Sequence, residues 1–542
     1  MRILIADKLA EEGAAYLRDQ EGIEVTIRTG LAGDDLADAL SEHDGAVVRS
    51  AVQITGPVLL RCAGTNGWRL KAIARAGVGV DNIDLETATR LGIAVMNAAS
   101  SSTITTAEHA FALMIALARN IPWAHAAMVS GGWDRNRFVG SELHGKTLGV
   151  IGLGRIGLTL ARRAVAFGMS VCAYDPLMNA ESAMEGQVPL LGSVHELLAR
   201  SDFVSVHVPG TEATAGMLNE AAFAAAKPGM RIINASRGSV IDESALLAAL
   251  ADGRCTGAAL DVYEPEPPAP DSPLRNHPKI LTTPHLGAST TEAQEAVAVD
   301  ACRAVVTYLR GEGIVGAVNA AGLSLDLSDR QRSFVDLSAR MIALLQAAVA
   351  PGRLGRVRFG IRGDGLVGGA ETVARYALVE LLRSHLDEPV SVINAALIAE
   401  QRHIETETVI GAEHGDDRLM IEVIQDGEAH RVEGAIYSDN LPRITSLDGY
   451  AMDMVPAGPM VLLTNADEPG RIGLVGRMFG EARVNIAEMV IGRRKGPTAG
   501  ETIAMMILKL DGAPTPSLLE ALRHGPGILS VASLELGATG HS

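Results

Sequence analysis

Three charged side chains follow three successive apolar stretches in the middle of the chain. Arg237 lies in NASRGS, Glu266 in VYEPEP and His285 in TPHLGA. Residues that follow parallel strands meet at one edge of the sheet, where ligands bind. An arginine can hold a carboxylate, a histidine can move a proton, and an acid can orient that histidine. We therefore predict that these three residues form the catalytic set of a hydride-transfer site.

A glycine-rich motif precedes this set. Gly152, Gly154 and Gly157 form G-x-G-x-x-G between an apolar stretch and an amphipathic helical stretch. Such glycines let the backbone approach a pyrophosphate, which binds at the helix N-terminus. Asp175 ends the next apolar stretch, where an acid accepts hydrogen bonds from ribose hydroxyls and repels a 2′-phosphate. The motif predicts a dinucleotide site that prefers NAD to NADP.

The elements that must position these residues alternate along the first 320 residues. Strands are expected at 2–7, 22–28, 45–50, 70–77 and 93–98, and again at 147–154, 169–175, 202–209, 231–236, 256–263 and 280–285. Strand–helix alternation predicts parallel sheets covered on both faces, and six strands are the number in a full dinucleotide fold. Thr105 and Glu108 form a capping-box pattern at the start of a long apolar helix between the two series. A helix at 289–311 is expected to return to the first domain.

The pattern changes after about residue 323. A helical stretch and several hairpin strands predict an α+β domain, and the last segment has the order βαββαβ, which is ferredoxin-like. The sequence thus predicts an α/β protein with two Rossmann-like doubly wound domains, an α+β intervening domain and a ferredoxin-like domain. The expected boundaries are 1–98 with 287–320, 99–286, 323–455 and 456–542.

The composition limits the classes of function. Of the 542 residues, 47% are apolar and 20% charged, so the chain can bury large cores. The net charge of −17 argues against binding nucleic acid or an acidic membrane. The four cysteines form no C-x-x-C pair, and no H-E-x-x-H metal motif or 18-residue apolar run occurs. We expect a cytoplasmic protein without a bound metal.

Several motifs resemble one known family. GLGRIG, NASRGSVIDE, ALDVYEPEP and TPHLGAST resemble the signatures of the D-isomer-specific 2-hydroxyacid dehydrogenases. RAGVGVDNIDLETATRLGIAVMN and GGWDRNRFVGSELHGKTLGVIGLGRIG resemble the members that oxidise 3-phospho-D-glycerate at the start of serine synthesis. The resemblance implies that His285 takes the C2 hydroxyl proton while hydride moves to NAD. It also implies that Glu266 bonds the other ring nitrogen and that Arg237 grips the substrate carboxylate.

The resemblance implies further contacts with the two small molecules. The residues matched to NAD contacts are Gly152, Gly154, Arg155, Ile156, Gly157, Asp175, His207, Ala235, Ser236, Asp261 and Gly287. Those matched to substrate contacts are Arg49, Ser50, Val78 and Gly79, with Arg135 reaching the substrate phosphate from a neighbouring subunit of a homo-oligomer, a dimer or a tetramer. The chain departs from the family pattern on the substrate side, at Val52, Gln53, Val78 and Ser102.

The segment NADEPGRIG and the later RVNIAEM resemble the ligand loop and second strand of an ACT domain. The helix N-terminus after Gly470 suits a carboxylate, and Asp467 is placed to receive an ammonium group. Asn485 begins the second strand and would contact the same ligand across a dimer interface. This pattern predicts feedback inhibition by L-serine. The alternative is a domain used only for assembly.

Two other functions compete with this interpretation. Another D-2-hydroxyacid dehydrogenase, such as a glyoxylate or hydroxypyruvate reductase, usually ends after the first two domains. A non-catalytic NAD(H)-sensing protein can share the fold and even the Arg–Glu–His set, so the fold alone does not exclude it. The long C-terminal half and the acidic chain favour the metabolic enzyme.

Overall fold

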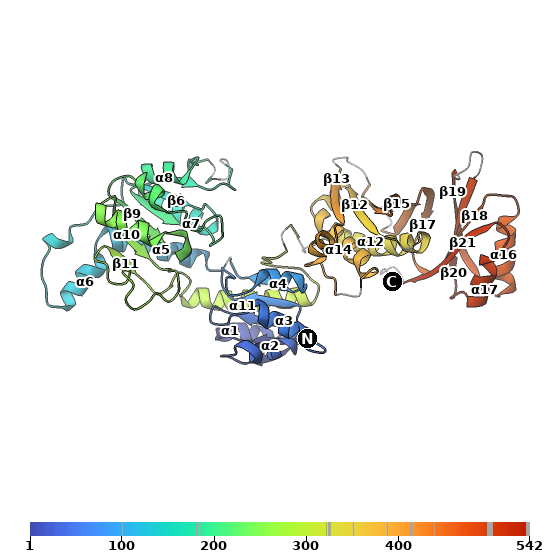
Figure 1. Cartoon of the computed structure of the whole chain (residues 1–542), viewed down its shortest axis with the longest axis horizontal. Coiled ribbons are helices and arrows are strands. Elements are labelled where there is room, and N and C mark those ends of the chain that lie inside the picture. The colour runs from blue at the N-terminus through green and yellow to red at the C-terminus, as the bar shows by residue number, and fades with distance from the viewer. Residues whose placement is uncertain are drawn as a thin grey trace.

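The chain forms four sheets that follow one another along an elongated molecule (Figure 1). The computed structural model describes residues 1–99, 101–179, 183–184, 186–320, 322–323, 327–350, 352–386, 389–411, 416–437, 440–495 and 502–537. The segment that carries the predicted catalytic residues lies toward one end of the molecule, and the C-terminal sheet lies at the other.

The first sheet is parallel, with the order β2-β1-β3-β4-β5. Its strands are β1 (Arg2–Ile5), β2 (Glu24–Ile27), β3 (Gly45–Val48), β4 (Ala72–Arg75) and β5 (Ala94–Asn97). Its helices are α1 (Glu11–Arg18), α2 (Gly33–Ser41), α3 (Gly56–Gly64) and α4 (Leu85–Arg90). The later helix α11 (Thr291–Leu309) packs beside α1 on the same sheet face, so the chain returns to this sheet as expected.

The second sheet is also parallel, with the order β11-β10-β9-β8-β6-β7. Its strands are β6 (Thr147–Ile151), β7 (Ser170–Tyr174), β8 (Phe203–Val206), β9 (Met230–Asn234), β10 (Cys255–Leu260) and β11 (Ile280–Thr282). A single bridge from Ala173 to Leu190 continues the sheet beyond β7. The dinucleotide fold therefore has its usual strand order, with the third strand reduced to one residue pair.

Helices cover both faces of the second sheet. The helices α5 (Thr103–Ala118) and α7 (Arg155–Ala166) share the core on one face. On the other face lie α8 (Val194–Arg200), α9 (Glu220–Ala224) and α10 (Glu243–Asp252). This two-sided burial explains the nearly continuous apolar strands that predicted it.

The capping box expected at Thr105 and Glu108 is wrong. The helix α5 begins earlier, at Thr103, and its N-cap is Ser102 without a side-chain cap. Thr105 instead contacts the Thr290 hydroxyl at 3.3 Å, and Glu108 pairs with Arg163 of α7 at 3.0 Å. Both side chains serve packing between helices, which the local pattern could not distinguish from a cap.

The helix α6 (Ile121–Val129) projects from the second sheet (Figure 1). None of its residues is buried. Among the described residues, no single helix is long and apolar enough to cross a membrane, although α5 and α6, bent by 65°, pass that test when taken together.

The intervening domain has a mixed sheet with the order β13-β12-β14-β15-β16-β17. Its strands are β12 (Leu354–Arg362), β13 (Glu405–Ile410), β14 (Arg418–Gln425), β15 (Glu428–Ile436), β16 (Pro442–Leu447) and β17 (Tyr450–Met454). Its helices are α12 (Asp329–Ala348), α13 (Asp364–Val367), α14 (Ala370–Arg383) and α15 (Ala395–Gln401). The long helix α12 starts with a capping box between Ser328 and Gln331.

The last sheet is antiparallel, with the order β19-β20-β18-β21. The chain order is β18 (Gly458–Ala466), α16 (Arg471–Glu481), β19 (Ile486–Lys495), β20 (Thr502–Leu510), α17 (Pro516–Arg523) and β21 (Ile528–Leu536), the expected βαββαβ. The helices α16 and α17 cover one face. On the other face, residues such as Met460 and Leu462 join the core of the intervening domain. The boundary expected near residue 455 therefore separates two sheets that share one hydrophobic core.

Candidate active site

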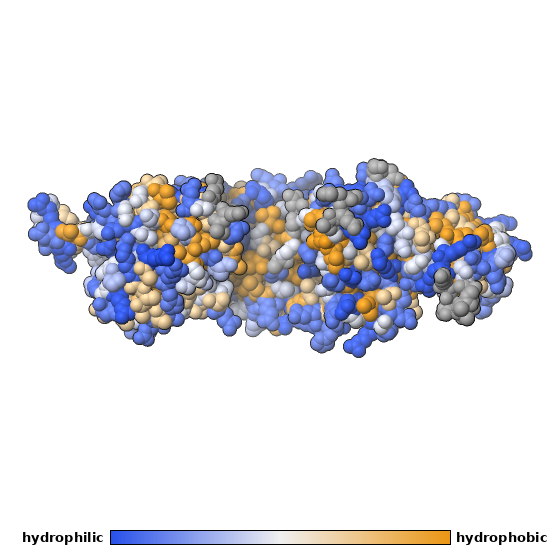
Figure 2. Space-filling view, turned by 90° about the horizontal axis from the view of Figure 1, so that it is seen from above, coloured by the Kyte–Doolittle hydropathy of each residue, from blue (hydrophilic) through white to orange (hydrophobic). Residues whose placement is uncertain are grey.

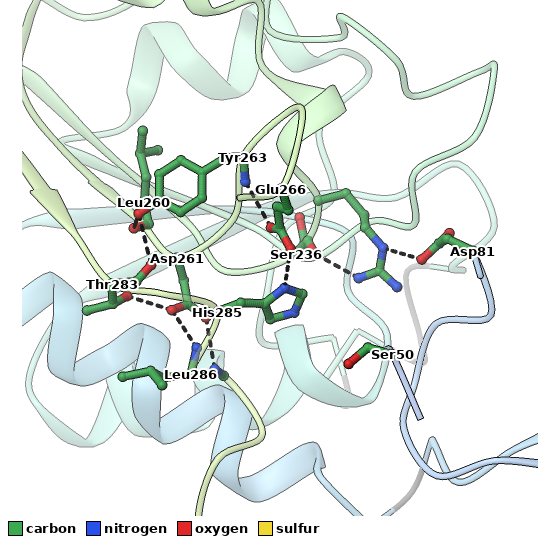
Figure 3. Close-up of polar contacts among 12 residues, drawn as sticks. Ser50, Asp81, Ser236, Leu260, Asp261, Tyr263, Glu266, Thr283, His285 and Leu286 are labelled. Atoms are coloured by element: carbon green, nitrogen blue, oxygen red, sulfur yellow. Dashed lines mark hydrogen bonds and ion pairs between the residues drawn. The ribbon is translucent and has the colours of Figure 1, made fainter. Parts of the chain in front are cut away.

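His285 and Glu266 meet at the carboxyl edge of β10 and β11 (Figure 3). The His285 Nδ1 atom lies 2.7 Å from Glu266 Oε2, and Glu266 Oε1 accepts the Tyr263 N–H at 3.0 Å. Burial raises the pKa of the Glu266 carboxyl, but the hydrogen bonds from His285 and Tyr263 outweigh burial and lower this pKa overall. Glu266 is thus an ionised acceptor, so Nδ1 must carry the hydrogen. The Nε2 atom of His285 is left to exchange a proton with a substrate.

Asp261 holds the loop that carries His285. Its side chain is fully buried and accepts hydrogen bonds from Thr283 Oγ1 and from the N–H groups of Leu286 and Gly287. The His109 Nε2 atom lies 3.2 Å from the same carboxylate. The backbone N–H of His285 also donates to the Asp261 carbonyl at 2.9 Å. These bonds hold His285 at a φ of 54°, in the left-handed region. In this structure Asp261 positions the loop, and its contact with NAD remains a prediction.

Arg237 follows β9 and reaches across the crevice between the first two domains to Asp81. Its Nε donates to Asp81 Oδ2 at 2.9 Å, and its NH1 donates to the Ser236 carbonyl at 2.7 Å. Asn234, which is 1% exposed, shapes this turn by accepting from Ser236 and donating to the Arg237 carbonyl. Sequence reasoning missed both Asn234 and Asp81. The signal was available, because Asn234 is the last residue of β9 and Asp81 lies on the loop after β4.

The substrate-domain loop fits closely against Arg237. A Cβ atom added at Gly79 would lie 1.7 Å from the Arg237 NH2 atom, so only glycine leaves room for the guanidinium. Val78 is held nearby, since its carbonyl accepts from Asn97 Nδ2 at 2.5 Å. Arg49 donates to the Lys8 carbonyl at 3.2 Å, and Ser50 is exposed on the same side of the crevice (Figure 3).

A third arginine joins Arg49 and Arg237 at the crevice. Arg75 ends β4, and its Nε is buried without a hydrogen-bond partner among the described residues. Burial, followed by repulsion from Arg237, lowers the pKa of the Arg75 guanidinium. Sequence reasoning did not single out Arg75, although it begins the quoted RAGVGVD motif. The three arginines form a positive cluster suited to an anionic substrate.

The glycine-rich turn between β6 and α7 provides a cradle for a pyrophosphate. Gly152 has a φ of 87°, and a Cβ there would lie 2.6 Å from the His207 carbonyl oxygen. A Cβ at Gly154 would meet no described atom within 4 Å, so this residue borders open space. The N–H groups of Arg155 and Ile156 have no protein partner in the described part of the chain. These features fit a phosphate group at a helix N-terminus.

Asp175 and His207 flank this turn. The Asp175 carboxylate accepts the N–H groups of Leu153 at 2.8 Å and Leu177 at 2.9 Å, which fixes it at the rim of the cradle. Burial lowers the pKa of His207 to about 4, so this imidazole is neutral near pH 7. Ala235 and Ser236 continue the same edge after β9. The residues present therefore fit a dinucleotide with an unphosphorylated ribose.

Known proteins are similar to this chain over its full length. Residues 111–287 match the D-isomer specific 2-hydroxyacid dehydrogenase, NAD binding domain. The D-3-phosphoglycerate dehydrogenase of Archaeoglobus fulgidus is 38% identical over 99% of this chain and 100% of its own length. That of Bacillus subtilis is 36% identical over 99% of both chains.

The chain belongs to the D-3-phosphoglycerate dehydrogenase family. The D-lactate dehydrogenase of Aquifex aeolicus, solved with NAD and lactic acid, is 28% identical with a TM-score of 0.51, over 57% of this chain and 96% of its own. The family assignment confirms the predicted class, an NAD-dependent oxidoreductase with a Rossmann-type domain.

The predicted phosphate-binding Arg135 and the predicted effector-binding pair, Asp467 and Asn485, lie apart from the catalytic set. Arg135 is exposed after α6, and no interaction joins it to Arg237, Glu266 or His285 in the described part of the chain. In the C-terminal sheet, Asp467 pairs with Arg493 at 3.1 Å, and Asn485 Nδ2 donates to Asp511 at 2.6 Å.

Proposed function

We propose that the chain oxidises 3-phospho-D-glycerate to 3-phosphooxypyruvate with NAD⁺, the first step of L-serine biosynthesis. The observation that carries the proposal is the His285–Glu266 contact of 2.7 Å beside Arg237. Relatives of the same length that bear the name D-3-phosphoglycerate dehydrogenase support this choice of substrate over other 2-hydroxy acids.

The residues of the crevice divide the reaction between them. Arg237 holds the substrate carboxylate, and His285 Nε2 takes the proton of the C2 hydroxyl. Glu266 accepts the hydrogen on Nδ1 and stabilises the charge that the imidazole gains. The glycine-rich turn at Gly152, Gly154 and Gly157 would hold NAD⁺, which would supply the hydride acceptor. Asp261 keeps His285 in place without touching the reacting atoms.

Turnover of 3-phosphoglycerate by the purified full-length protein tests this function. NADH formation with NAD⁺ is expected to exceed that with NADP⁺, and replacing Asp175 by Ser should narrow that preference. A folded protein that binds NADH but turns over an unphosphorylated 2-hydroxy acid better than 3-phosphoglycerate would contradict the substrate assignment.

The substrate phosphate needs more positive charge than Arg237 supplies. We place it near Arg49 and Arg75, with Arg135 contributed by a second copy of the chain. Exposed apolar side chains near Arg135 support contact with that copy. They are Ile121, Met128, Val129, Trp133 and Val139. Apolar surface is visible at this end of the molecule in Figure 2. Replacing Arg135 by Ala should raise KM for 3-phosphoglycerate more than KM for an unphosphorylated acid. A monomeric variant should show the same defect.

We also propose that L-serine binds at the C-terminal domain, between two subunits, and inhibits the enzyme. The helix α16 follows Gly470, which has a φ of 93°, and the N–H groups of Ile472 and Gly473 have no partner among the described residues. These groups suit the serine carboxylate, and Asp467 suits its ammonium. Because Asp467 pairs with Arg493 at 3.1 Å, the ammonium must compete with that guanidinium.

Allosteric coupling is typically worth ~1–3 kcal/mol, or ~5–150-fold in affinity. Asp467→Ala should relieve inhibition by serine and leave the uninhibited kcat unchanged. Calorimetry that detects no serine binding to the wild-type protein would leave this domain, with Asn485 at its second strand, as an assembly module.

A further inference from the structure

Asp81 reaches Arg237 from the opposite domain. It lies on the loop after β4, whereas Arg237 follows β9, and the two side chains form an ion pair of 2.9 Å across the crevice (Figure 3). Asp81 has no other hydrogen-bond or ion-pair partner among the described residues. Its carboxylate therefore bonds Arg237 and attracts Arg75 without contacting it.

The loop that carries Asp81 is held rigidly on both sides. Asn82 Nδ2 donates to the carbonyls of Arg49 and Val52, at 2.9 and 2.7 Å. The Val78 carbonyl accepts from Asn97, and the Gly77 carbonyl accepts the Ala98 N–H at 3.0 Å. A carboxylate on such a loop presents its charge at a fixed point.

Two contacts fix the orientation of the Arg237 guanidinium. Asp81 takes the Nε hydrogen and the Ser236 carbonyl takes one NH1 hydrogen. The NH2 group lies over Gly79, where a side chain would collide with it. The NH2 hydrogens and the second NH1 hydrogen have no partner in the described part of the chain, so they form the edge that can bind a carboxylate.

Charge and exposure argue that this ion pair does more than stabilise the fold. Asp81 is 64% exposed and Arg237 is 26% exposed, and pairs of this kind add little to stability. Arg75, in contrast, repels the Arg237 guanidinium from within the same cluster. A nearby carboxylate is needed to keep Arg237 pointing into the crevice.

We propose that Asp81 is a positioning residue, which orients Arg237 for the substrate carboxylate when the two domains face each other. Asp81 does not touch the substrate. It holds the Nε side of the guanidinium so that the other edge is free. It can do so only when the two domains are as close as they are here, with Asp81 Oδ2 2.9 Å from Arg237 Nε. This inference rests on the proposed function in one respect, the role of Arg237 as the carboxylate clamp.

The test compares Asp81→Ala and Asp81→Asn with the wild type in steady-state kinetics. The alanine variant should raise KM for 3-phosphoglycerate about tenfold and leave KM for NAD⁺ within about twofold, as expected when one charge-assisted hydrogen bond to a substrate-binding group is lost. The asparagine variant keeps an acceptor for Nε and should recover part of the loss. Replacing the exposed Asp35 of α2 by Asn removes the same charge from the same domain and should change neither constant.

A double-mutant cycle separates positioning from a general effect. In the Arg237→Lys background, which has no Nε–H and no planar fork, Asp81→Ala should add little further loss. Additive effects would overturn the proposal. A lower KM in Asp81→Ala would also overturn it, because Asp81 would then compete with the substrate.

The cycle can be run with any 2-hydroxy acid that the wild type oxidises. Coupling between Asp81 and Arg237 without turnover of 3-phosphoglycerate would refute the proposed substrate and keep this inference. Turnover of 3-phosphoglycerate without coupling between Asp81 and Arg237 would refute this inference and keep the proposed substrate.

Discussion

At the scale of single residues, the chemistry depends on which ring nitrogen of His285 is free. Glu266 is an ionised carboxylate that can only accept, so the hydrogen of the contact belongs to Nδ1. Tyr263 holds the second carboxylate oxygen through its backbone N–H at 3.0 Å. The acid is thereby fixed in the plane where it can orient the imidazole.

Replacing His285 by Ala removes the proton shuttle. We expect kcat to fall by ~10²–10⁴-fold, the usual contribution of general acid–base catalysis. NADH binding, measured by fluorescence titration, should change little because the glycine-rich turn is untouched. Near-normal turnover in this variant would refute the shuttle.

The lowered pKa of Glu266 makes a prediction about pH. A carboxyl whose pKa is lower in the folded state contributes stability above its ordinary pKa, 4.5, and loses that contribution as pH falls through the lower folded value. Glu266→Gln removes the charge at every pH. The difference in Tm between wild type and this variant should be constant from about pH 7 to 5 and shrink below about pH 4.5. A difference that grows as the solution is acidified would have the wrong sign for an ionised Glu266.

At the scale of elements, one buried carboxylate organises the loop between β11 and α11. Asp261 lies at the end of β10 and receives donors from that loop and from His109 of α5. Three elements distant in the sequence therefore fix the place of His285. Burial raises the pKa of Asp261, but hydrogen bonds from His109, Thr283 and Leu286 lower it overall, so the acceptor remains charged.

Asp261→Asn should disturb this loop, because the amide NH2 would face backbone N–H donors. We expect a loss of stability of about 1–3 kcal/mol and a lower kcat, since a buried donor is left unpaired. Thermal unfolding and steady-state kinetics measure the two effects. Asp242→Asn, at the exposed N-cap of α10, is a matched control that should change neither stability nor kcat, because asparagine caps a helix about as well as aspartate. Wild-type kcat in Asp261→Asn would show that the loop does not depend on this carboxylate.

At the scale of the whole molecule, the C-terminal sheet is attached to the intervening domain by a shared core and by two arginines, the buried Arg340 and the exposed Arg494. Arg340 of α12 pairs with Asp336 and donates to the carbonyls of Pro456, at 2.8 Å, and Gly537, at 2.7 Å. Arg494 of β19 bonds Asp448 at 3.0 Å and stacks over the Tyr450 ring. Arg340 thus ties α12 to the residues just before β18 and just after β21. Arg494 ties the edge strand β19 to the turn before β17. The last sheet is therefore packed directly against the intervening domain.

Arg340→Gln should loosen this attachment. The glutamine cannot reach both carbonyls, and leaving the buried Pro456 acceptor without its charged donor costs about 1–3 kcal/mol. Limited proteolysis near residue 456 should become faster, while kcat without effector should be unchanged because the crevice lies in the other half of the molecule. Arg332→Gln, on the exposed side of the same helix, is the control. Proteolysis as slow as in the wild type would mean that the shared core alone fixes the last sheet.

Local patterns in the sequence were enough to predict the strands, the six-strand dinucleotide sheet and the final βαββαβ order. They were also enough to select Arg237, Glu266, His285 and the glycine-rich turn, because all of these follow strand ends, and parallel strands place their ends at one edge. The site was therefore predictable wherever its geometry follows from the sheet alone.

The remaining features depend on contacts between segments far apart in the chain. Asp81 meets Arg237 only because two domains face each other. The Arg75 guanidinium is buried at the same place, which lowers its pKa. Thr105 and Glu108 have a capping pattern, yet packing against α7 and α11 decides their partners. Likewise, one face of the last sheet is buried on α12 because both surfaces are apolar. Periodicity reports which face of an element is apolar, whereas the partner of that face is decided by the tertiary structure.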